Sequence, residues 1–392
     1  MSPAPATAPL PAPPPGCVAI RPVRTRADRR AFVDLVWELY ATDPHWVPPL
    51  KSEVHALMDP AKNPWFEHAE AEFFLAFRGA RPVGRISAQA DRLVEEHTGA
   101  GTGQWGFFEA ADAEAAAVLI AAAEGWLKGR GMTRALGPFT LSIWDEPGLL
   151  VTGCDCPPTV MMGHHLPQYA GWVEAAGYAG VKDLLTYELD ITQKMPALVR
   201  RLVSNTQRNP RVRIRKVDKS RFDAEARIIL GILNDAWSDN WGFVPLTDAE
   251  VAYAGKKLKP IVFEDMIRIA EYDGEPVAFM ITLPDVNALI RDLDGRLFPF
   301  GWAKLLLRLR HPRTNTVRVP LMGVVKRLQS SALAGGLAFS LIEEIREAVV
   351  ADYGGKRGEI GWILEDNEGM KAIADAIETR INKVYRIYER AL

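Results

Sequence analysis

The chain has 392 residues, of which 48% are hydrophobic and 24% charged, enough for two ordinary globular domains. Its 47 Lys and Arg residues nearly balance its 49 Asp and Glu residues, which excludes the overall basic field of a nonspecific nucleic-acid binder. No stretch carries the roughly 18 uninterrupted apolar residues of a membrane-spanning helix, and three cysteines are too few for a disulfide framework.

Residues 1–16 form a tail rich in proline and alanine. The tail lacks the basic start and apolar stretch of a signal peptide, so we expect it to be disordered. Cys154 and Cys156 lack a second ligand pair at zinc-like spacing, and we expect no metal site. The sparse cysteines favour a reducing compartment, which predicts a cytoplasmic protein.

After the tail, the chain repeats a pattern of predicted elements. An alternating strand at 18–23 recurs at 212–217, and helix-period segments follow at about 27–40 and 224–237. Each helix leads to a tryptophan before a proline, and then to a hairpin whose turn holds Gly79 or Gly274. This doubling predicts a first domain at 17–191 and a second at 192–392.

The second copy carries an insertion, predicted at 286–312, before its next strand. The strand at 104–109 is matched by one at 317–325, and long helices follow at 113–128 and 333–351. Within the insertion, residues 297–310 interleave aromatic and leucine side chains with Lys304, Arg308 and Arg310. Such a segment suits a helix on an anionic membrane or over a lipid tunnel, although a core helix with snorkelling cations fits equally well.

The order of strands and helices resembles the GNAT superfamily, which implies an α/β (α+β) fold of two tandem domains, each a mixed central sheet flanked by helices. In that family the phosphates of acyl-CoA bind where the fourth strand meets the next helix, since free amides and the helix dipole stabilise anions there. The family's turn reads Gln/Arg-x-x-Gly-x-Gly/Ala, and residues 329–334 match it with Ala332 and Ala334 in place of glycine. A small-residue helix start that merely packs closely is the alternative. The resemblance assigns acyl-CoA binding to Val324, Val325, Lys326, Arg327, Gln329, Ser330, Ser331, Ala332, Leu333, Ala334 and Asn367.

The matching turn of the first copy, 109–114, has no glycine and carries Glu109, Asp112 and Glu114. We expect these three carboxylates to point at the same place and to repel pyrophosphate. The first domain is therefore predicted to be degenerate for CoA and to serve as scaffold or acceptor-binding wall.

Four segments, 137–150, 157–165, 182–187 and 234–245, are similar to the bacterial ceramide synthase family of long acyl-CoA-dependent N-acyltransferases. The resemblance implies transfer of a fatty acyl group from acyl-CoA to the amine of a long-chain sphingoid base, with 3-oxosphinganine as the expected acceptor. Acyl-CoA is then a co-substrate, and no permanently bound cofactor is expected.

The implied reaction needs a proton acceptor for the amine and a proton donor for the departing thiolate. The candidate residues for these roles are His164, His165, Asp145, Glu146, Glu365 and Tyr388. Loop capping by the histidines, turn formation by the acids and aromatic packing by the tyrosine are the structural alternatives. Residues expected at the acceptor wall are Trp237, Asn240, Trp241 and Phe243.

Two rival functions stay open. A tandem-GNAT aminoacyl or peptidyl transferase would use a tRNA-borne donor and need a basic groove, for which the arginines and lysines of 208–221 are the only local candidate. Their alternation with apolar residues is more typical of the solvated face of an edge strand, so we expect no nucleic-acid partner. A non-catalytic lipid-binding scaffold is the second rival. The expected partners are long-chain acyl-CoA, a sphingoid base and, through 297–310, the surface of the inner membrane.

Overall fold

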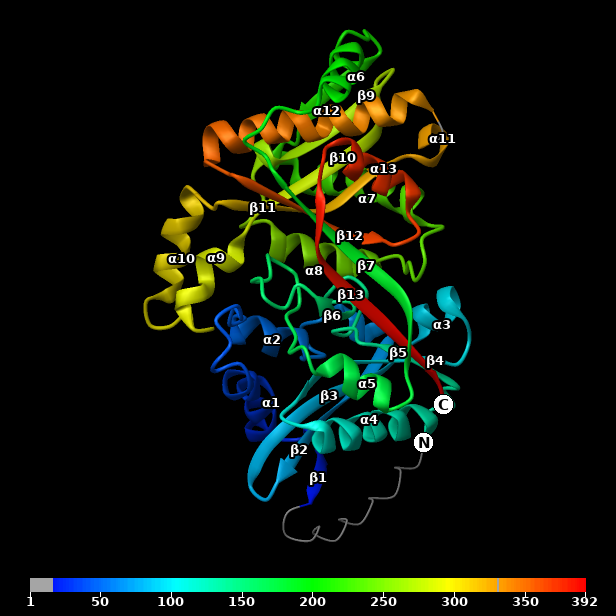
Figure 1. Cartoon of the computed structure of the whole chain (residues 1–392), viewed down its shortest axis with the longest axis vertical. Coiled ribbons are helices and arrows are strands. Elements are labelled where there is room, and N and C mark those ends of the chain that lie inside the picture. Colours follow the sequence, from blue (N-terminus) through cyan, green and yellow to red (C-terminus); the bar gives the residue numbers. More distant parts are fainter. Residues whose placement is uncertain (1–16, 330) are drawn as a thin grey trace.

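A computed structural model describes residues 17–329 and 331–392, and Figure 1 shows two halves stacked along the long axis. The predicted tail at 1–16 lies outside these residues. In the first half, matching α/β elements follow the expected order. These are β1 (Val18–Pro22), α1 (Arg26–Leu39), α2 (Lys51–Leu57), η1 (Pro64–Glu67), β2 (Ala69–Arg78), β3 (Arg81–Asp91), α3 (Arg92–Thr98), β4 (Thr102–Ala110), α4 (Ala113–Lys128), β5 (Arg134–Gly137), β6 (Leu149–Thr152) and α5 (Tyr169–Ala175).

The second half repeats the order and adds the two helices of the insertion, α9 and α10. β7 (Ala179–Asp190) is the last strand of the first half in chain order. The second half then holds α6 (Ala197–Gln207), β8 (Val212–Lys216), η2 (Lys219–Arg221), α7 (Phe222–Trp237), α8 (Asp248–Leu258), η3 (Glu264–Met266), β9 (Ile267–Tyr272), β10 (Glu275–Pro284), α9 (Val286–Ile290), η4 (Arg291–Leu293), α10 (Gly301–Arg310), β11 (Thr316–Val324), α11 (Lys326–Gln329), α12 (Ala332–Ala348), η5 (Val349–Tyr353), β12 (Arg357–Leu364), α13 (Glu368–Ala376) and β13 (Arg380–Ala391).

The hairpin turns that the sequence predicts are confirmed. Gly79 and Gly274 have positive φ angles of 64° and 82°, which glycine adopts without the steric cost that a side chain brings. Each turn joins two long antiparallel strands, β2 with β3 and β9 with β10.

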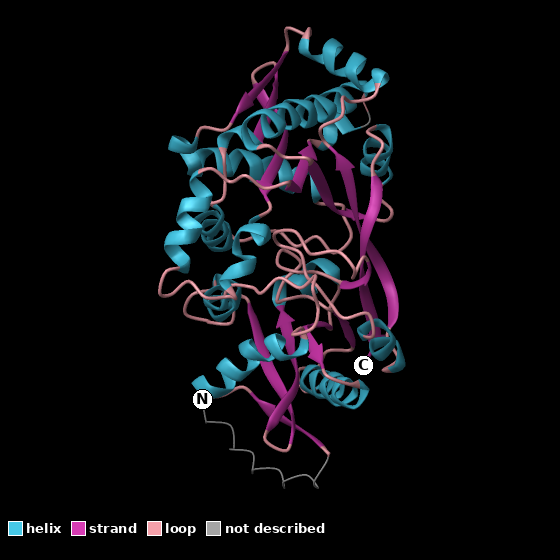
Figure 2. Cartoon of the chain, turned by 60° about the vertical axis from the view of Figure 1, so that its left-hand side comes forward, coloured by secondary structure: helices cyan, strands magenta, loops and turns pink. Residues whose placement is uncertain are grey.

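One continuous sheet joins the two halves. Its strand order is β1-β2-β3-β4-β5-β13-β7-β12-β11-β10-β9-β8, with β6 paired to β13. The last strand, β13, therefore pairs with β5 of the first half, while β7 pairs with β12 of the second half. Figure 1 shows β7 and β13 running side by side between the halves, and Figure 2 shows the same long strands from another side. The domain boundary at residue 191 stays a prediction, and the halves share strands across it.

In each half, two parallel strands pair at one end and separate at the other. β4 pairs with β5 only over Thr102–Gln104, and β11 pairs with β12 only over Thr316–Val319. Beyond these residues the edges that face each other are no longer paired, although each strand keeps its partner strand on the other side. We call the gap after Val319 and Ile360 the β11–β12 opening.

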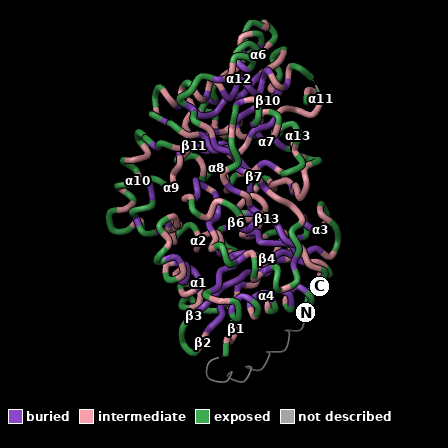
Figure 3. Tube along the Cα trace, viewed as in Figure 1, coloured by how far each residue is buried: buried purple, intermediate pink, exposed green. Residues whose placement is uncertain are grey.

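Long apolar helices cover the sheet. The buried face of α12 includes Leu337, Leu341 and Ile345, which recur at helical spacing and join the core cluster of β9 and β10. In the first half, α4 buries Leu119, Ala123 and Leu127 in the same manner. Figure 3 shows these buried residues gathered along the sheet.

Candidate active site

Buried charged side chains lie at the base of the β11–β12 opening. Arg318 on β11 is 1% exposed and donates to the carbonyl oxygens of Val160, at 2.8 Å, and Gly361, at 3.0 Å. Its guanidinium carbon lies 4.8 Å from the ring centre of Trp362 on β12. Arg318 thus ties together the two strands at the point where they separate.

Glu359 of β12 is the counter-charge beside Arg318. It accepts from Lys383 Nζ at 2.6 Å, Asn382 Nδ2 at 2.6 Å and Thr159 Oγ1 at 2.5 Å. Burial opposes ionisation of Glu359, but the charge of Lys383 and these hydrogen bonds hold its pKa below the usual value. Sequence reasoning missed this network, and its only signal was charged residues within otherwise apolar strands.

His164 lies in a loop held against the opening by Tyr385 of β13. The Tyr385 hydroxyl donates to the Gly163 carbonyl at 2.9 Å, and its ring packs edge-on to Trp362 at 6.4 Å. His164 Nε2 lies 2.8 Å from Asp43 Oδ2, while Nδ1 is buried without a hydrogen-bond partner. Burial lowers the pKa of His164, the Asp43 carboxylate opposing this shift, so the imidazole is neutral at pH 7.

The other catalytic candidates lie in different surroundings. His165 Nδ1 accepts from the Leu150 amide at 3.1 Å, and burial lowers its pKa to about 3. Asp145 accepts from Ser142 Oγ at 2.9 Å, and burial raises its pKa to about 6. Glu146 is exposed on the same turn, 3.4 Å from Thr140 Oγ1.

Glu365 and Tyr388 lie apart from His164. Glu365 is exposed just after β12 and accepts from the Asp183 amide at 3.1 Å. Tyr388 belongs to the core cluster of the first half and donates to Glu174 at 3.1 Å, and burial raises its pKa to about 12. The structure therefore does not bring Tyr388 to the β11–β12 opening.

The predicted phosphate turn follows β11 and begins α12. Ser331 caps the helix, its Oγ accepting from the Ala334 amide at 3.3 Å, and Ala332 is exposed in the first turn. First-turn amides such as those of Ala332 and Leu333 have no partner within a helix and point along its axis. Gln329 Nε2 donates to the carbonyl of Val324 at 2.9 Å, which closes the turn, and the Val325 amide donates to Val277 at 2.9 Å. Ser330 lies outside the described residues.

Both cations of this turn have carboxylate partners. Lys326 Nζ lies 2.5 Å from Asp239 Oδ2, and Arg327 lies 2.8 Å from Glu275. Asp239 and Glu275 are exposed, with 84% and 73% of their side chains accessible, so an arriving phosphate can replace them. Asn367 caps α13 by accepting from the Met370 amide at 3.0 Å, which leaves its Nδ2 donor group for other partners.

In the first half, two of the three acids of the turn at 109–114 lie at the start of α4 as expected, and Glu109 does not. Asp112 caps α4, accepting from the Ala115 amide at 3.0 Å, and pairs with Arg78 at 2.7 Å, so a protein carboxylate already occupies that helix start. Glu114 also pairs with Arg78, at 2.8 Å. The prediction that Glu109 points at the same place was wrong. Its carboxylate is buried and accepts from two tyrosine hydroxyls, Tyr40 at 2.8 Å and Tyr169 at 2.9 Å.

A bulge in β4 explains the position of Glu109. Between the pairs Arg85–Glu109 and Ser87–Gly106, β4 has one more residue than β3, and Phe107 has a φ angle of 47°. Because of the extra residue, each β4 side chain after the bulge points to the opposite face of the sheet from the one that regular alternation would give. Burial then raises the pKa of Glu109 to about 7, although Arg85 lies 3.8 Å away.

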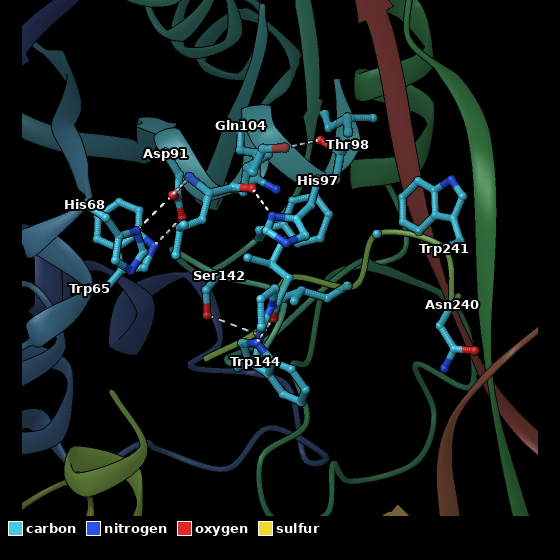
Figure 4. Close-up of a pocket in the computed structure, with 18 of the residues that line it drawn as sticks. Trp65, His68, Asp91, His97, Thr98, Gln104, Ser142, Trp144, Asn240 and Trp241 are labelled. Atoms are coloured by element: carbon cyan, nitrogen blue, oxygen red, sulfur yellow. Dashed lines mark hydrogen bonds and ion pairs between the residues drawn. The ribbon is translucent and has the colours of Figure 1, made fainter. Parts of the chain in front are cut away.

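A cavity of about 390 Å³ lies between the halves (Figure 4). One wall holds His68 and Asp91, joined at 2.9 Å, and the opposite wall holds Asn240 and Trp241. Gln104 of β4 also lines it, and the Gln104 Oε1 is buried without a hydrogen-bond partner. Sequence reasoning named Asn240 and Trp241 but missed the first-half wall, because nothing local marks it.

The other two residues of the predicted acceptor wall pack around Trp144. Trp237 stacks on Trp144 at 6.2 Å and donates to the Met322 carbonyl of β11 at 3.1 Å. Phe243 packs edge-on to Trp144 at 5.8 Å. Trp144, Asn240 and Trp241 line the cavity, whereas Trp237 and Phe243 are linked to it only through their packing on Trp144.

Comparison with known proteins identifies the family. A curated bacterial ceramide synthase of Caulobacter vibrioides (strain NA1000 / CB15N) is 45% identical over 378 residues, covering 96% of this chain and 98% of that protein. The chain belongs to the bacterial ceramide synthase family. Protein YghO of Escherichia coli (strain K12) is 41% identical over 376 residues, covering 95% of each chain. No protein-family model matches the chain.

Solved structures confirm the fold of this family member. A tandem GNAT protein from the clavulanic acid biosynthesis pathway gives a TM-score of 0.56 at 13% identity, covering 95% of this chain and 98% of that chain. A GCN5-related N-acetyltransferase from Sphaerobacter thermophilus gives 0.52 at 12% identity, covering 95% of both chains. The protein is an N-acyltransferase with two tandem GNAT-type halves.

Within residues 17–329 and 331–392, no helix has both the length and the apolar content needed to cross a membrane. No group of three or more His, Cys, Asp or Glu side chains in these residues is arranged to hold a metal ion.

Proposed function

We propose that this N-acyltransferase moves a fatty acyl group from acyl-CoA to the amine of a long-chain sphingoid base, with 3-oxosphinganine as the expected acceptor. One observation carries the proposal. The second half has an opening between β11 and β12 that leads to an exposed helix start at Ala332, whereas Asp112 fills the equivalent start of α4 in the first half. The name of the Caulobacter relative, 45% identical, supports the acceptor class.

Acyl-CoA is proposed to bind along β11. Its pyrophosphate would accept hydrogen bonds from the first-turn amides of α12. It would also take the place of the Asp239 carboxylate beside the Lys326 ammonium group. The pantetheine arm would then follow the unpaired edge of β11 into the opening, toward Arg318 and Trp362. This route places the thioester beside the loop that carries His164.

His164 is proposed as the general base. If Nε2–H donates to Asp43, the unpartnered Nδ1 is the basic nitrogen, and the lowered pKa keeps it unprotonated at pH 7. The amine attacks the thioester carbonyl carbon, a C–N bond forms and the C–S bond breaks. The amine proton passes to His164 and then to the departing thiolate, which gives an amide and free CoA thiol.

The cavity between the halves is proposed to take the polar head of the acceptor. Gln104 Oε1 offers a buried hydrogen-bond acceptor without a partner, and Glu250 lies on the same surface, so the cavity suits a donor-rich amine and hydroxyl group. Leu93, Val94 and Leu136 supply apolar walls for the start of a hydrocarbon chain. In this arrangement Trp241 lines the side of the cavity that contacts the acceptor.

The tRNA-dependent alternative loses its support. Within the basic run, Arg211 pairs with Asp273, Arg215 with Glu225 and Glu271, and Lys216 with Asp265. These carboxylates offset part of the charge that a nucleic acid would need. We propose instead a cytoplasmic protein that contacts the inner membrane through 297–310.

Release of CoA thiol tests the proposal. The purified protein is mixed with palmitoyl-CoA, with and without 3-oxosphinganine, and free thiol and amide product are measured together. We expect thiol release that depends on the acceptor and equals the amide formed. Lipid binding without thiol release would make the protein a scaffold, and release without amide formation would contradict the proposed acceptor.

A further inference from the structure

The insertion carries an exposed apolar patch, defined here as Phe298, Phe300, Trp302, Leu306 and Leu307. Their exposed fractions are 83%, 77%, 50%, 53% and 64%, in that order. Elsewhere in the described residues, only Leu198 and Ile381 are large hydrophobic residues exposed to a similar degree, and each stands alone. Five exposed apolar side chains within positions 298–307 mark a candidate interaction surface.

The patch does not support the packing of its own segment. Leu297 and Leu305 face inward against Val47, Ile290 and Leu293, while α10 contains no buried residue. Arg308 pairs with Asp292 at 2.6 Å, and Lys304 pairs with the same carboxylate, so ion pairs and two leucines hold the helix in place. The alternative of a core helix is therefore wrong for α10.

A basic hollow lies beside the patch. This hollow, about 520 Å³, is lined by six cationic side chains and only two carboxylates, Asp34 and Asp59. The cations are Arg26, Arg29, Arg30, Lys51, Lys62 and Arg296. Asp34 pairs with Lys51 and Arg30, and Asp59 with Lys62, which leaves the other three arginines without an ion pair among the described residues.

The hollow and the patch belong to one surface. Arg296, which lines the hollow, lies two residues before Phe298, the most exposed residue of the patch. The insertion rests directly on the first half, since the Lys51 amide donates to Gly295 at 3.0 Å and Trp37 Nε1 to Asp294 at 2.6 Å. Figure 1 places α10, α9, α2 and α1 along the same side of the molecule.

We infer that this surface docks on an anionic phospholipid bilayer, the patch entering the interface and the hollow binding a headgroup phosphate. This deepens the proposed membrane contact of 297–310, because the first half, through α1 and α2, supplies the phosphate site. Guanidinium groups match phosphate oxygens in a bidentate manner, and aromatic side chains favour the bilayer interface. A second copy of the chain is a poor occupant, since its own unpaired arginines would repel this surface.

Vesicle co-sedimentation of the full chain tests the inference. The vesicles contain phosphatidylcholine alone or with 30% phosphatidylglycerol, and the salt concentration is varied. We expect at least ten-fold stronger binding to the anionic vesicles, weakening as salt rises. Equal binding to both vesicle types, or none, would overturn the inference.

Two sets of substitutions separate the two parts of the surface. Arg26→Glu with Arg29→Glu and Arg296→Glu should remove the preference for anionic vesicles, and Phe298→Ser with Phe300→Ser should weaken binding to both vesicle types at least ten-fold. The matched control is α6, where Leu198, Arg200 and Arg201 are exposed. Leu198→Ser with Arg200→Glu and Arg201→Glu should leave vesicle binding unchanged.

Further outcomes decide between the occupants. If the variants of the patch change the sedimentation coefficient in solution and not vesicle binding, the surface is a contact between copies and the inference fails. If inorganic phosphate, at a concentration equal to that of the lipid phosphate groups, prevents vesicle binding, the hollow is a site for soluble anions and the inference also fails. Thiol release with detergent-dispersed acceptor should be unchanged in all variants, so failure of the docking surface and failure of the proposed reaction give different results.

Discussion

Asp43 and His164 are separated by 121 residues in the chain, and a hydrogen bond of 2.8 Å joins Asp43 Oδ2 to His164 Nε2. The pair lies beside Tyr40, whose ring packs 5.8 Å from the imidazole and whose hydroxyl oxygen, bonded to Glu109, lies 3.1 Å from the His164 carbonyl oxygen. The carboxylate fixes the ring and its tautomer, and the buried Nδ1 has no partner. An oriented imidazole with one unused nitrogen is suited to move a proton.

Replacement of His164 should slow the reaction without weakening acyl-CoA binding. Because general-base catalysis contributes typically 10²- to 10⁴-fold, we expect His164→Ala to lower kcat by about 100-fold or more. Asp43→Asn should give an intermediate loss, since it disturbs only the tautomer. Steady-state kinetics with calorimetric acyl-CoA titration checks this, and wild-type kcat in His164→Ala would exclude this histidine from the mechanism.

The pH dependence of the reaction should follow the same residue. Burial lowers the pKa of His164 from its ordinary 6.5, so the basic, neutral form persists below pH 6.5 and is lost only as the pH falls further. We therefore expect the acid limb of the kcat profile to have its midpoint below pH 6.5. A midpoint at or above that pH, or an unchanged limb in Asp43→Asn, would contradict the assignment.

Removal of Asp239 should strengthen acyl-CoA binding. Its carboxylate holds Lys326 at 2.5 Å and must leave when a phosphate arrives. Exposed pairs contribute roughly 0.2 to 1 kcal/mol, so Asp239→Asn should tighten binding by about 1.4- to five-fold at low salt and less at high salt. Glu38→Gln, which frees Arg81 on the first half, is the matched control. Equal acyl-CoA affinities for Asp239→Asn and wild type would show that Lys326 does not contribute to phosphate binding.

The buried pair of Glu359 and Lys383 should matter for stability. Both side chains are almost fully inaccessible, and their charged atoms lie 2.6 Å apart. Glu359→Gln leaves the ammonium group buried without a counter-charge, which costs about 3 to 5 kcal/mol of unfolding free energy. The double variant Glu359→Gln, Lys383→Met should recover part of this loss. Urea unfolding measures both, and a loss under about 1 kcal/mol in the single variant would show that the pair is solvated.

The order of elements could be predicted from the sequence because it depends on local signals. Alternating strands, helix-period segments and the glycine turns at Gly79 and Gly274 mark each copy separately. The pairing of β7 with β12 and of β13 with β5, each across the two halves, could not be predicted. It depends on contacts between segments that are far apart in the sequence, such as Leu184 and Tyr385. No local pattern records such pairing.

The site was predictable only in part, for physical reasons that differ between residues. The turn from Gln329 to Ala334 has a spacing that a helix start imposes, whereas the orientation of Glu109 depends on one extra residue in β4. Arg318 and Glu359 resemble the solvated face of a strand in sequence, yet they are buried and paired. Burial of charge depends on what packs above the strand, which the strand's own residues do not determine.

Binding of acyl-CoA by the second half alone can be tested with a matched pair of substitutions. Ala332 and Ala113 are both exposed first residues of a helix, α12 in the second half and α4 in the first. We predict that Ala332→Glu abolishes acyl-CoA binding in a calorimetric titration, while Ala113→Glu binds as the wild type does. Loss of binding in Ala113→Glu together with unchanged affinity in Ala332→Glu would contradict the account.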